Sequence, residues 1–115
     1  MAHPVVHFEI GAKDINKLKS FYSNLFEWQY QEYGPAAMVA PQGGQGIGGH
    51  INAIGHEPHN YVTVYVQVDD IEAKLAEAEK LGGKCIVPKQ EVPQMGWFAW
   101  IQDPEGNCIG LWKTM

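Results

Sequence analysis

Hydrophobic residues alternate with other residues along two segments of the chain, residues 5–11 and 61–68. In the second segment, valines at 62, 64, 66 and 68 fall on one face, and two tyrosines, a threonine and a glutamine fall on the other. A period of two residues is typical of a β-strand that rests one face on a hydrophobic core. The pattern therefore predicts a strand in each segment.

A helix is predicted after each of these strands. Asp14 precedes the first helix, and Asp69 or Asp70 precedes the second; an aspartate side chain in this position accepts hydrogen bonds from the first helical turn. Apolar residues recur at helical spacing in both segments, which predicts one buried stripe on each helix. The stripe expected on the first helix consists of Ile15, Leu18, Phe21, Tyr22, Leu25 and Phe26.

Three further strands are predicted in each half of the chain, so the order strand, helix, strand, strand, strand occurs twice. They are residues 28–33, 36–40 and a strand that ends at 50–53, then 84–88, 97–102 and 107–113, with a polar connector at 55–59 between the halves. Each half is too short to fold alone, so the two copies should share one sheet system. We therefore expect an α+β fold with a single domain over residues 1–115, built from a first module at about 5–54 and a second at about 60–114.

Composition excludes several classes of function. All eight basic residues are lysines, against thirteen acidic residues, and the formal net charge is −5. Nucleic-acid binding needs a basic surface and favours arginine, as does phosphate binding. Two cysteines are too few for a disulfide scaffold. No apolar run approaches the length of a membrane span, and the first residues do not resemble a signal peptide. A cytoplasmic domain with no nucleic-acid or membrane partner is expected.

The two halves together carry a family resemblance. Its segments are Val6-His7-Phe8-Glu9-Ile10, Phe21-Tyr22, Leu25-Phe26-Glu27-Trp28, Val66-Gln67-Val68-Asp69-Asp70-Ile71, Leu81-Gly82-Gly83-Lys84 and Asp103-Pro104-Glu105-Gly106-Asn107. In this order and at this spacing, they resemble the vicinal oxygen chelate superfamily of glyoxalase I, bleomycin-resistance proteins and extradiol dioxygenases. The resemblance implies two βαβββ modules that form a half-open, eight-stranded cup with the helices outside and a small-ligand pocket inside. It also implies a homodimer.

The resemblance further implies where a metal ion would be held. Metal-dependent members use one residue from the first strand and one from the fourth strand of each module. The matching positions here are His7 and Gly48 in the first module, and Thr63 and Gly110 in the second. Glycine offers no side-chain ligand, and a threonine hydroxyl is a poor one. We therefore expect the family's metal site to be absent and no cofactor to be needed.

An improvised site is the alternative. Strand alternation places Glu9 on the face of His7, and His50 on the face of Gly48. His7, Glu9 and His50 could form a set of two histidines and one carboxylate for a divalent metal, with His7 and His50 as the metal-ligand candidates. His7 and Glu9 could also act as acid and base without a metal, and they are the candidate catalytic residues. The other interpretation is that these polar residues line a wet pocket and hydrogen-bond to each other or to a ligand.

Strand alternation also predicts the lining of the pocket. The predicted ligand-binding residues are His7, Glu9, His50, Thr63, Tyr65, Gln67, Phe98, Trp100, Cys108 and Trp112. Aromatic rings with a few polar groups suit a small aromatic or apolar molecule. The rings could instead pack against each other or against a second subunit. We therefore predict a metal-free protein that binds such a molecule, and keep a metal-dependent lyase, isomerase or dioxygenase as the alternative. A partner-binding domain with a vestigial pocket is a third possibility, and whether the protein is an enzyme stays open.

Overall fold

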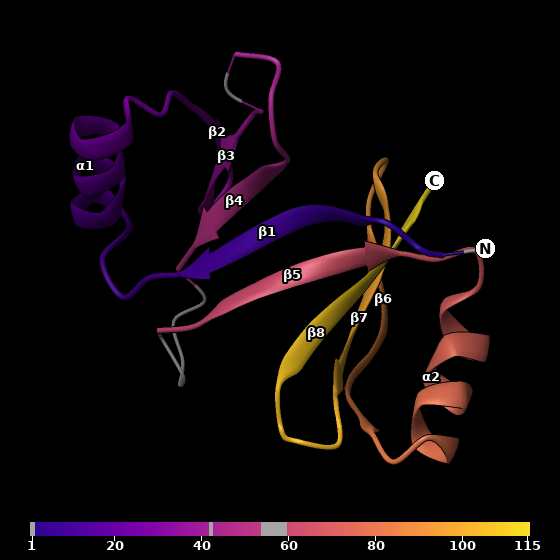
Figure 1. Cartoon of the computed structure of the whole chain (residues 1–115). Coiled ribbons are helices and arrows are strands. Elements are labelled where there is room, and N and C mark those ends of the chain that lie inside the picture. Colours follow the sequence, from indigo (N-terminus) through magenta and orange to yellow (C-terminus); the bar gives the residue numbers. More distant parts are fainter. Residues whose placement is uncertain (1, 42, 54–59) are drawn as a thin grey trace. The chain divides into compact units, whose positions relative to one another are not determined.

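The computed structural model describes residues 2–41, 43–53 and 60–115, which contain eight strands and two helices (Figure 1). The elements follow the order β1, α1, β2, β3, β4 and then β5, α2, β6, β7, β8. The predicted α+β class and the repeated order of one strand, one helix and three strands are therefore confirmed. The predicted connector at 55–59 lies outside the described residues.

The first repeat is a four-stranded arrangement with one helix. Its elements are β1 (Val5–Gly11), α1 (Ile15–Phe26), β2 (Tyr30–Tyr33), β3 (Ala36–Val39) and β4 (Gly48–Asn52). Strand β1 pairs in parallel with β4, and β4, β3 and β2 follow one another as antiparallel neighbours. In the parallel pair, His7 lies opposite Gly48 and Glu9 lies opposite His50.

The second repeat has the same internal order. Its elements are β5 (Val62–Gln67), α2 (Ile71–Lys80), β6 (Lys84–Val92), β7 (Gly96–Gln102) and β8 (Cys108–Thr114). Strand β5 pairs in parallel with β8, and β8, β7 and β6 are antiparallel neighbours. Tyr65 lies opposite Gly110 in the parallel pair.

The chain folds into two compact units. Residues 7–63 form the N-terminal unit, and residues 64–115 together with residues 1–6 form the C-terminal unit. The first residues belong to the C-terminal unit because the N–H of Gln67 donates to the carbonyl of Pro4 at 2.9 Å.

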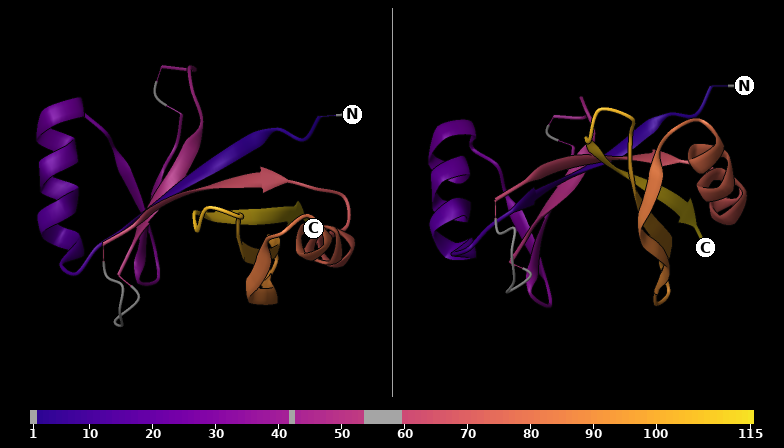
Figure 2. Two further views of the ribbon diagram at one scale, coloured as in Figure 1. Left: turned by 60° about the horizontal axis from the view of Figure 1, so that its bottom comes forward. Right: turned by 90° about the horizontal axis from the view of Figure 1, so that it is seen from below.

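The core of the C-terminal unit lies between α2 and the strands that it covers (Figure 2). Its buried residues are Val68, Ile71, Ala99 and Leu111, and Val66, Leu75, Trp97 and Ile101 pack against them. The predicted faces of these strands are therefore correct, because Val66, Val68, Ala99 and Ile101 lie on the helix side. The residues that alternate with them point to the opposite side of the sheet.

Helix α1 begins and ends for clear local reasons, but it is less buried than its pattern predicts. The Asp14 side chain caps it by accepting from the N–H groups of Asn16 and Lys17 at 3.1 and 3.2 Å. The helix ends at Glu27, whose φ of 61° is left-handed. Leu25 and Phe26 remain 57% and 53% exposed.

The expected buried stripe on α1 is therefore wrong for its outer residues, including Phe21, which is 55% exposed. The physical reason is the size of the sheet beside the helix. Strands β2 and β3 have four residues each, which is shorter than a twelve-residue helix. Trp28, predicted to start the second strand, instead stacks on Tyr22 with ring centroids 5.0 Å apart.

Neither helix in the described part of the chain is long and apolar enough to cross a membrane.

Burial in the N-terminal unit gives a direct stability prediction. Ile51 is fully buried in β4, whereas Leu25 is largely exposed on α1. Ile51→Ala should lower the free energy of unfolding by about 2–5 kcal/mol, because it leaves a cavity. Leu25→Ala should change it by less than about 1 kcal/mol, because little apolar surface is lost and alanine favours a helix. Urea unfolding of the whole chain measures both changes in the free energy of unfolding. Equal losses in the two variants would contradict the exposure of Leu25 on α1.

Candidate functional site

Two histidines from neighbouring strands form the centre of the polar site. His7 lies on β1 and His50 on β4, and their registers place them diagonally across the parallel pair. The Nε2 atom of His7 lies 2.7 Å from the Nδ1 atom of His50, within hydrogen-bond distance. The ring centroids are 4.9 Å apart. One imidazole must donate and the other accept, so their tautomers are coupled.

Glu9 is buried beside this pair and contacts His50. It is only 3% exposed, and its Oε1 atom lies 3.4 Å from the Nε2 atom of His50. Its Oε2 atom accepts a hydrogen bond from the hydroxyl of Tyr61. A buried carboxyl group needs polar partners of this kind, because loss of water is costly for a charged group. The side chains of Glu9, His50 and His7 therefore form a polar chain with Tyr61 at its buried end.

The surroundings keep both imidazoles neutral at neutral pH. Burial, with a smaller contribution from His50, lowers the pKa of His7 to about 4, although Glu9 opposes the shift. Burial also lowers the pKa of His50, again against the attraction of Glu9. A neutral imidazole has one donor and one acceptor nitrogen, whereas the cation has two donors. The pair can therefore both donate and accept hydrogen bonds.

The C-terminal unit contributes an aromatic face on the side of its sheet away from α2. Tyr65 is 6% exposed, and its hydroxyl accepts a hydrogen bond from the indole N–H of Trp100 at 2.8 Å. The Tyr65 ring lies directly against Gly110, where a Cβ atom would come within 2.4 Å of the ring. Any side chain at position 110 would therefore have to displace the ring.

The other predicted site residues are distributed over the two units. Thr63 is buried at 4% exposure, and Gln67 is exposed at the end of β5. Phe98 and Trp112 lie opposite each other in the β7–β8 register and are partly exposed. Cys108 lies opposite Gln102 in the same pair of strands. Whether these residues bind a ligand stays a prediction.

Tyr61 lies on the predicted pocket face of the fifth strand, and it contacts Glu9 directly. The alternation that places Thr63 and Tyr65 on one face places Tyr61 there as well. It lies just before the first residue of β5.

The donors present do not fit the metal site that the family resemblance implies. The four positions hold His7, Gly48, Thr63 and Gly110, and a Cβ atom at Gly48 would come within 3.0 Å of the Val39 carbonyl oxygen. In the described ranges, no three His, Cys, Asp or Glu side chains gather around one point. A structural or catalytic metal such as zinc usually needs three or four protein ligands.

The improvised set of His7, Glu9 and His50 fails for a geometric reason. Glu9 and His7 contact opposite ring nitrogens of His50, Nε2 and Nδ1 respectively. The three side chains therefore do not converge on one point. Their arrangement is that of a row of polar contacts.

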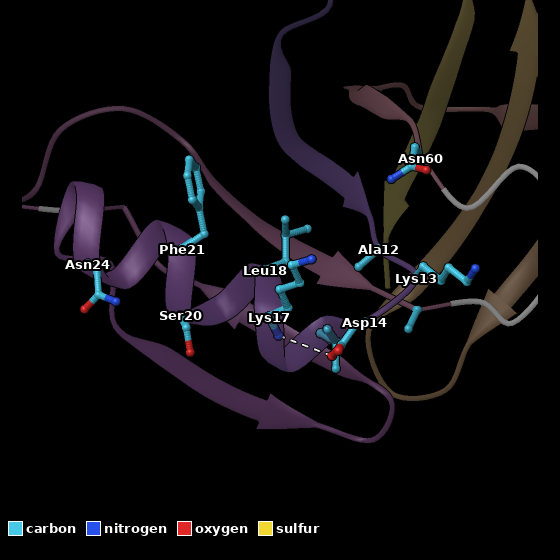
Figure 3. Close-up of a pocket in the computed structure, with 11 residues that line it drawn as sticks. Ala12, Lys13, Asp14, Lys17, Leu18, Ser20, Phe21, Asn24 and Asn60 are labelled. Carbon is cyan, nitrogen blue, oxygen red and sulfur yellow. Dashed lines mark hydrogen bonds between the residues drawn. The ribbon is translucent and has the colours of Figure 1, made fainter.

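A groove beside α1 is lined mainly by lysine, asparagine and apolar side chains (Figure 3). Its volume is about 1050 Å³, and its lining includes Lys13, Lys17, Leu18, Phe21 and Asn24. None of the predicted site residues lines it.

Comparison with known proteins decides the family. The model of the Glyoxalase/Bleomycin resistance protein/Dioxygenase superfamily matches residues 5–111. The chain belongs to this superfamily. This confirms the resemblance drawn from the sequence.

Relatives in the glyoxalase superfamily differ in length from this chain. A protein of Didymella fabae named glyoxylase-like domain-containing protein is 29% identical over 112 residues, covering 90% of this chain and 88% of its own. The "Putative glyoxylase CFP32" of Mycobacterium bovis is 25% identical over 114 residues, covering 92% of this chain. The chain spans only 44% of the length of that relative.

Solved structures show the same fold. Methylmalonyl-CoA epimerase from Mycobacterium tuberculosis aligns with a TM-score of 0.70 at 13% identity, covering 96% of this chain and 87% of the epimerase chain. At this identity the likeness shows the superfamily fold alone.

The lowered pKa of His7 predicts how stability depends on pH. The unfolded ring takes up a proton near its ordinary pKa of 6.5, whereas the folded ring does so only near 4. Between these values the unfolded state binds more protons, so the free energy of unfolding should fall as the pH falls. We expect a loss of the order of 1 kcal/mol between pH 7 and pH 5, after allowance for the partial exposure of the ring.

Urea unfolding at a series of pH values measures this effect. His7→Gln should flatten the curve over this range, leaving the smaller contribution of His50. A wild-type stability that stays constant from pH 7 to pH 5 would contradict the burial of a neutral His7.

Proposed function

We propose that this member of the superfamily binds a small aromatic or apolar molecule without a resident metal ion. The observation that carries the proposal is the Tyr65 ring, which lies against Gly110 and accepts a hydrogen bond from Trp100. In metal-dependent relatives, the position of Gly110 typically provides a glutamate ligand. Here an aromatic ring takes up the space that such a side chain would need.

The rest of this face supports an uncharged ligand. Trp100, Phe98 and Trp112 alternate with the residues of the core and are partly exposed. The side chains that share this side of β5, β7 and β8 up to Trp112 include no lysine, arginine or carboxylate. Aromatic side chains with a few polar groups are typical of small-molecule sites. A metal-dependent lyase, isomerase or dioxygenase gains no support from the donor arrangement described above.

A pair of tryptophans in one strand provides a matched test of ligand binding. Trp100 lies on the proposed ligand side of β7, whereas Trp97 packs against the core on the helix side. Benzamide serves as the aromatic probe, and cyclohexanecarboxamide is its saturated control. Trp100→Leu should weaken benzamide binding about tenfold or more, because stacking area is lost. Trp97→Leu should lower the melting temperature but leave the affinity within about twofold.

Titration calorimetry measures the affinities, and thermal unfolding confirms that each variant is folded. Failure of the wild-type protein to distinguish the two amides would contradict an aromatic site. Equal loss of affinity in the two variants would show that Trp100 acts only through stability.

We also propose that the chain forms a homodimer and works in the cytoplasm, as expected from its sequence and family resemblance. Light scattering coupled to size-exclusion chromatography should give about twice the chain mass of 12.8 kDa. A mass of one chain at working concentration would contradict the dimer.

A further inference from the structure

We propose that the groove beside α1 is a second binding site, which takes a small monocarboxylate with an apolar tail. Lys13 and Lys17 hold the carboxylate group, and Phe21 contacts the tail. The residues that line the groove all belong to the N-terminal unit (Figure 3). Its volume of about 1050 Å³ is large enough for a small organic molecule.

The groove is opposite in charge to the chain as a whole. Its lining contains two lysines, Lys13 and Lys17, and one carboxylate, that of Asp14. The Asp14 carboxylate caps the helix by accepting from the backbone N–H groups of Asn16 and Lys17. The lining therefore has a net charge of +1, whereas the chain has a formal net charge of −5. This sign favours an anionic ligand over a neutral or cationic one.

The two lysines have no acidic partner within residues 2–41, 43–53 and 60–115. Lys19, on the same helix, forms a salt bridge with Glu32, but none involves Lys13 or Lys17 in these ranges. Both lysines are exposed. A lysine ammonium group lies on a flexible four-carbon side chain and can turn toward a bound carboxylate. The groove therefore offers two cationic groups that the described structure leaves available.

The apolar part of the groove follows one helical turn later on α1. Phe21 comes four positions after Lys17, so the two side chains lie on one face of the helix. The Phe21 ring is 55% exposed and packs edge-on against Tyr22, with ring centroids 5.1 Å apart. Leu18 adds an aliphatic side chain to the lining. A ligand that contacts both parts of the groove has to join an acidic group to an apolar tail.

Three probes test this chemistry on the wild-type protein. Octanoate has both features, octanamide has the tail without the charge, and acetate has the charge without the tail. Octanoate should bind about fivefold more tightly than octanamide and about tenfold more tightly than acetate. A high salt concentration should remove its advantage over octanamide, because salt screens exposed charges.

NMR titration of the backbone amides measures these affinities and locates the ligand. Octanoate should shift the amides of residues 12–24. Equal affinity for octanoate and octanamide at low salt, or for octanoate and acetate, would overturn the proposal. So would octanoate shifts confined to residues 64–115, which hold the aromatic face.

Two matched pairs of variants test the named side chains. The double variant Lys13→Gln/Lys17→Gln should weaken octanoate binding about fivefold and leave octanamide unchanged. Lys84→Gln, at an exposed position on β6, should change neither. Phe21→Ala should weaken both probes about threefold or more. Leu25→Ala should change neither, because Leu25 is 57% exposed on the same helix but does not line the groove.

Two results with these variants would refute the site. One is an equal loss of octanoate affinity in Phe21→Ala and Leu25→Ala, and the other is an equal loss in Lys84→Gln and the double lysine variant. Vesicles of equal parts phosphatidylcholine and phosphatidylglycerol offer similar chemistry as a surface, and we expect no co-sedimentation with them. Co-sedimentation that the double lysine variant abolishes would overturn the small-molecule site in favour of membrane docking.

Discussion

Parallel pairing between the first and fourth strands of each repeat is the constraint on which the candidate sites depend. It brings Glu9 opposite His50 in the first repeat, and Tyr65 opposite Gly110 in the second. In both repeats an aromatic ring of the first strand lies across a glycine of the fourth. A Cβ atom would come within 2.4 Å of Phe8 at Gly49, and equally close to Tyr65 at Gly110. These glycines are required for close approach, and their lack of a side chain is what makes the ring packing possible.

This packing occupies one of the positions at which the family resemblance implies a metal ligand. At Gly110 the space that a ligand side chain would need holds the Tyr65 ring, and the hydroxyl of that ring accepts from Trp100. In the N-terminal unit, His7 and Glu9 contact opposite nitrogens of His50, which builds a chain of hydrogen-bonding groups. The superfamily fold here carries an aromatic face in one unit and a pair of imidazoles in the other, and burial keeps the pKa of His7 low.

Sequence periodicity was sufficient for the elements and for the faces of the strands. The alternation around Val66, Val68 and Ala99 correctly predicts which side chains pack under α2. Periodicity was not sufficient for α1, because an apolar stripe does not reveal how much sheet is available to cover it; Phe21 and Leu25 therefore remain exposed. Nor could it predict which ring nitrogen of His50 faces Glu9, since that depends on side-chain rotation. The alternation along a strand predicts which residues share a face. It does not predict whether their side chains converge on one metal ion or contact one another in a row.

Metal-free binding of an aromatic molecule is tested by the metal content of protein purified without chelator, combined with benzamide affinity before and after EDTA treatment. We predict well under one equivalent of any divalent metal, and an affinity that EDTA leaves unchanged within about twofold. Stoichiometric zinc, nickel, manganese or iron that is lost in His7→Ala would contradict it. So would an affinity that disappears with EDTA and returns when the metal is restored.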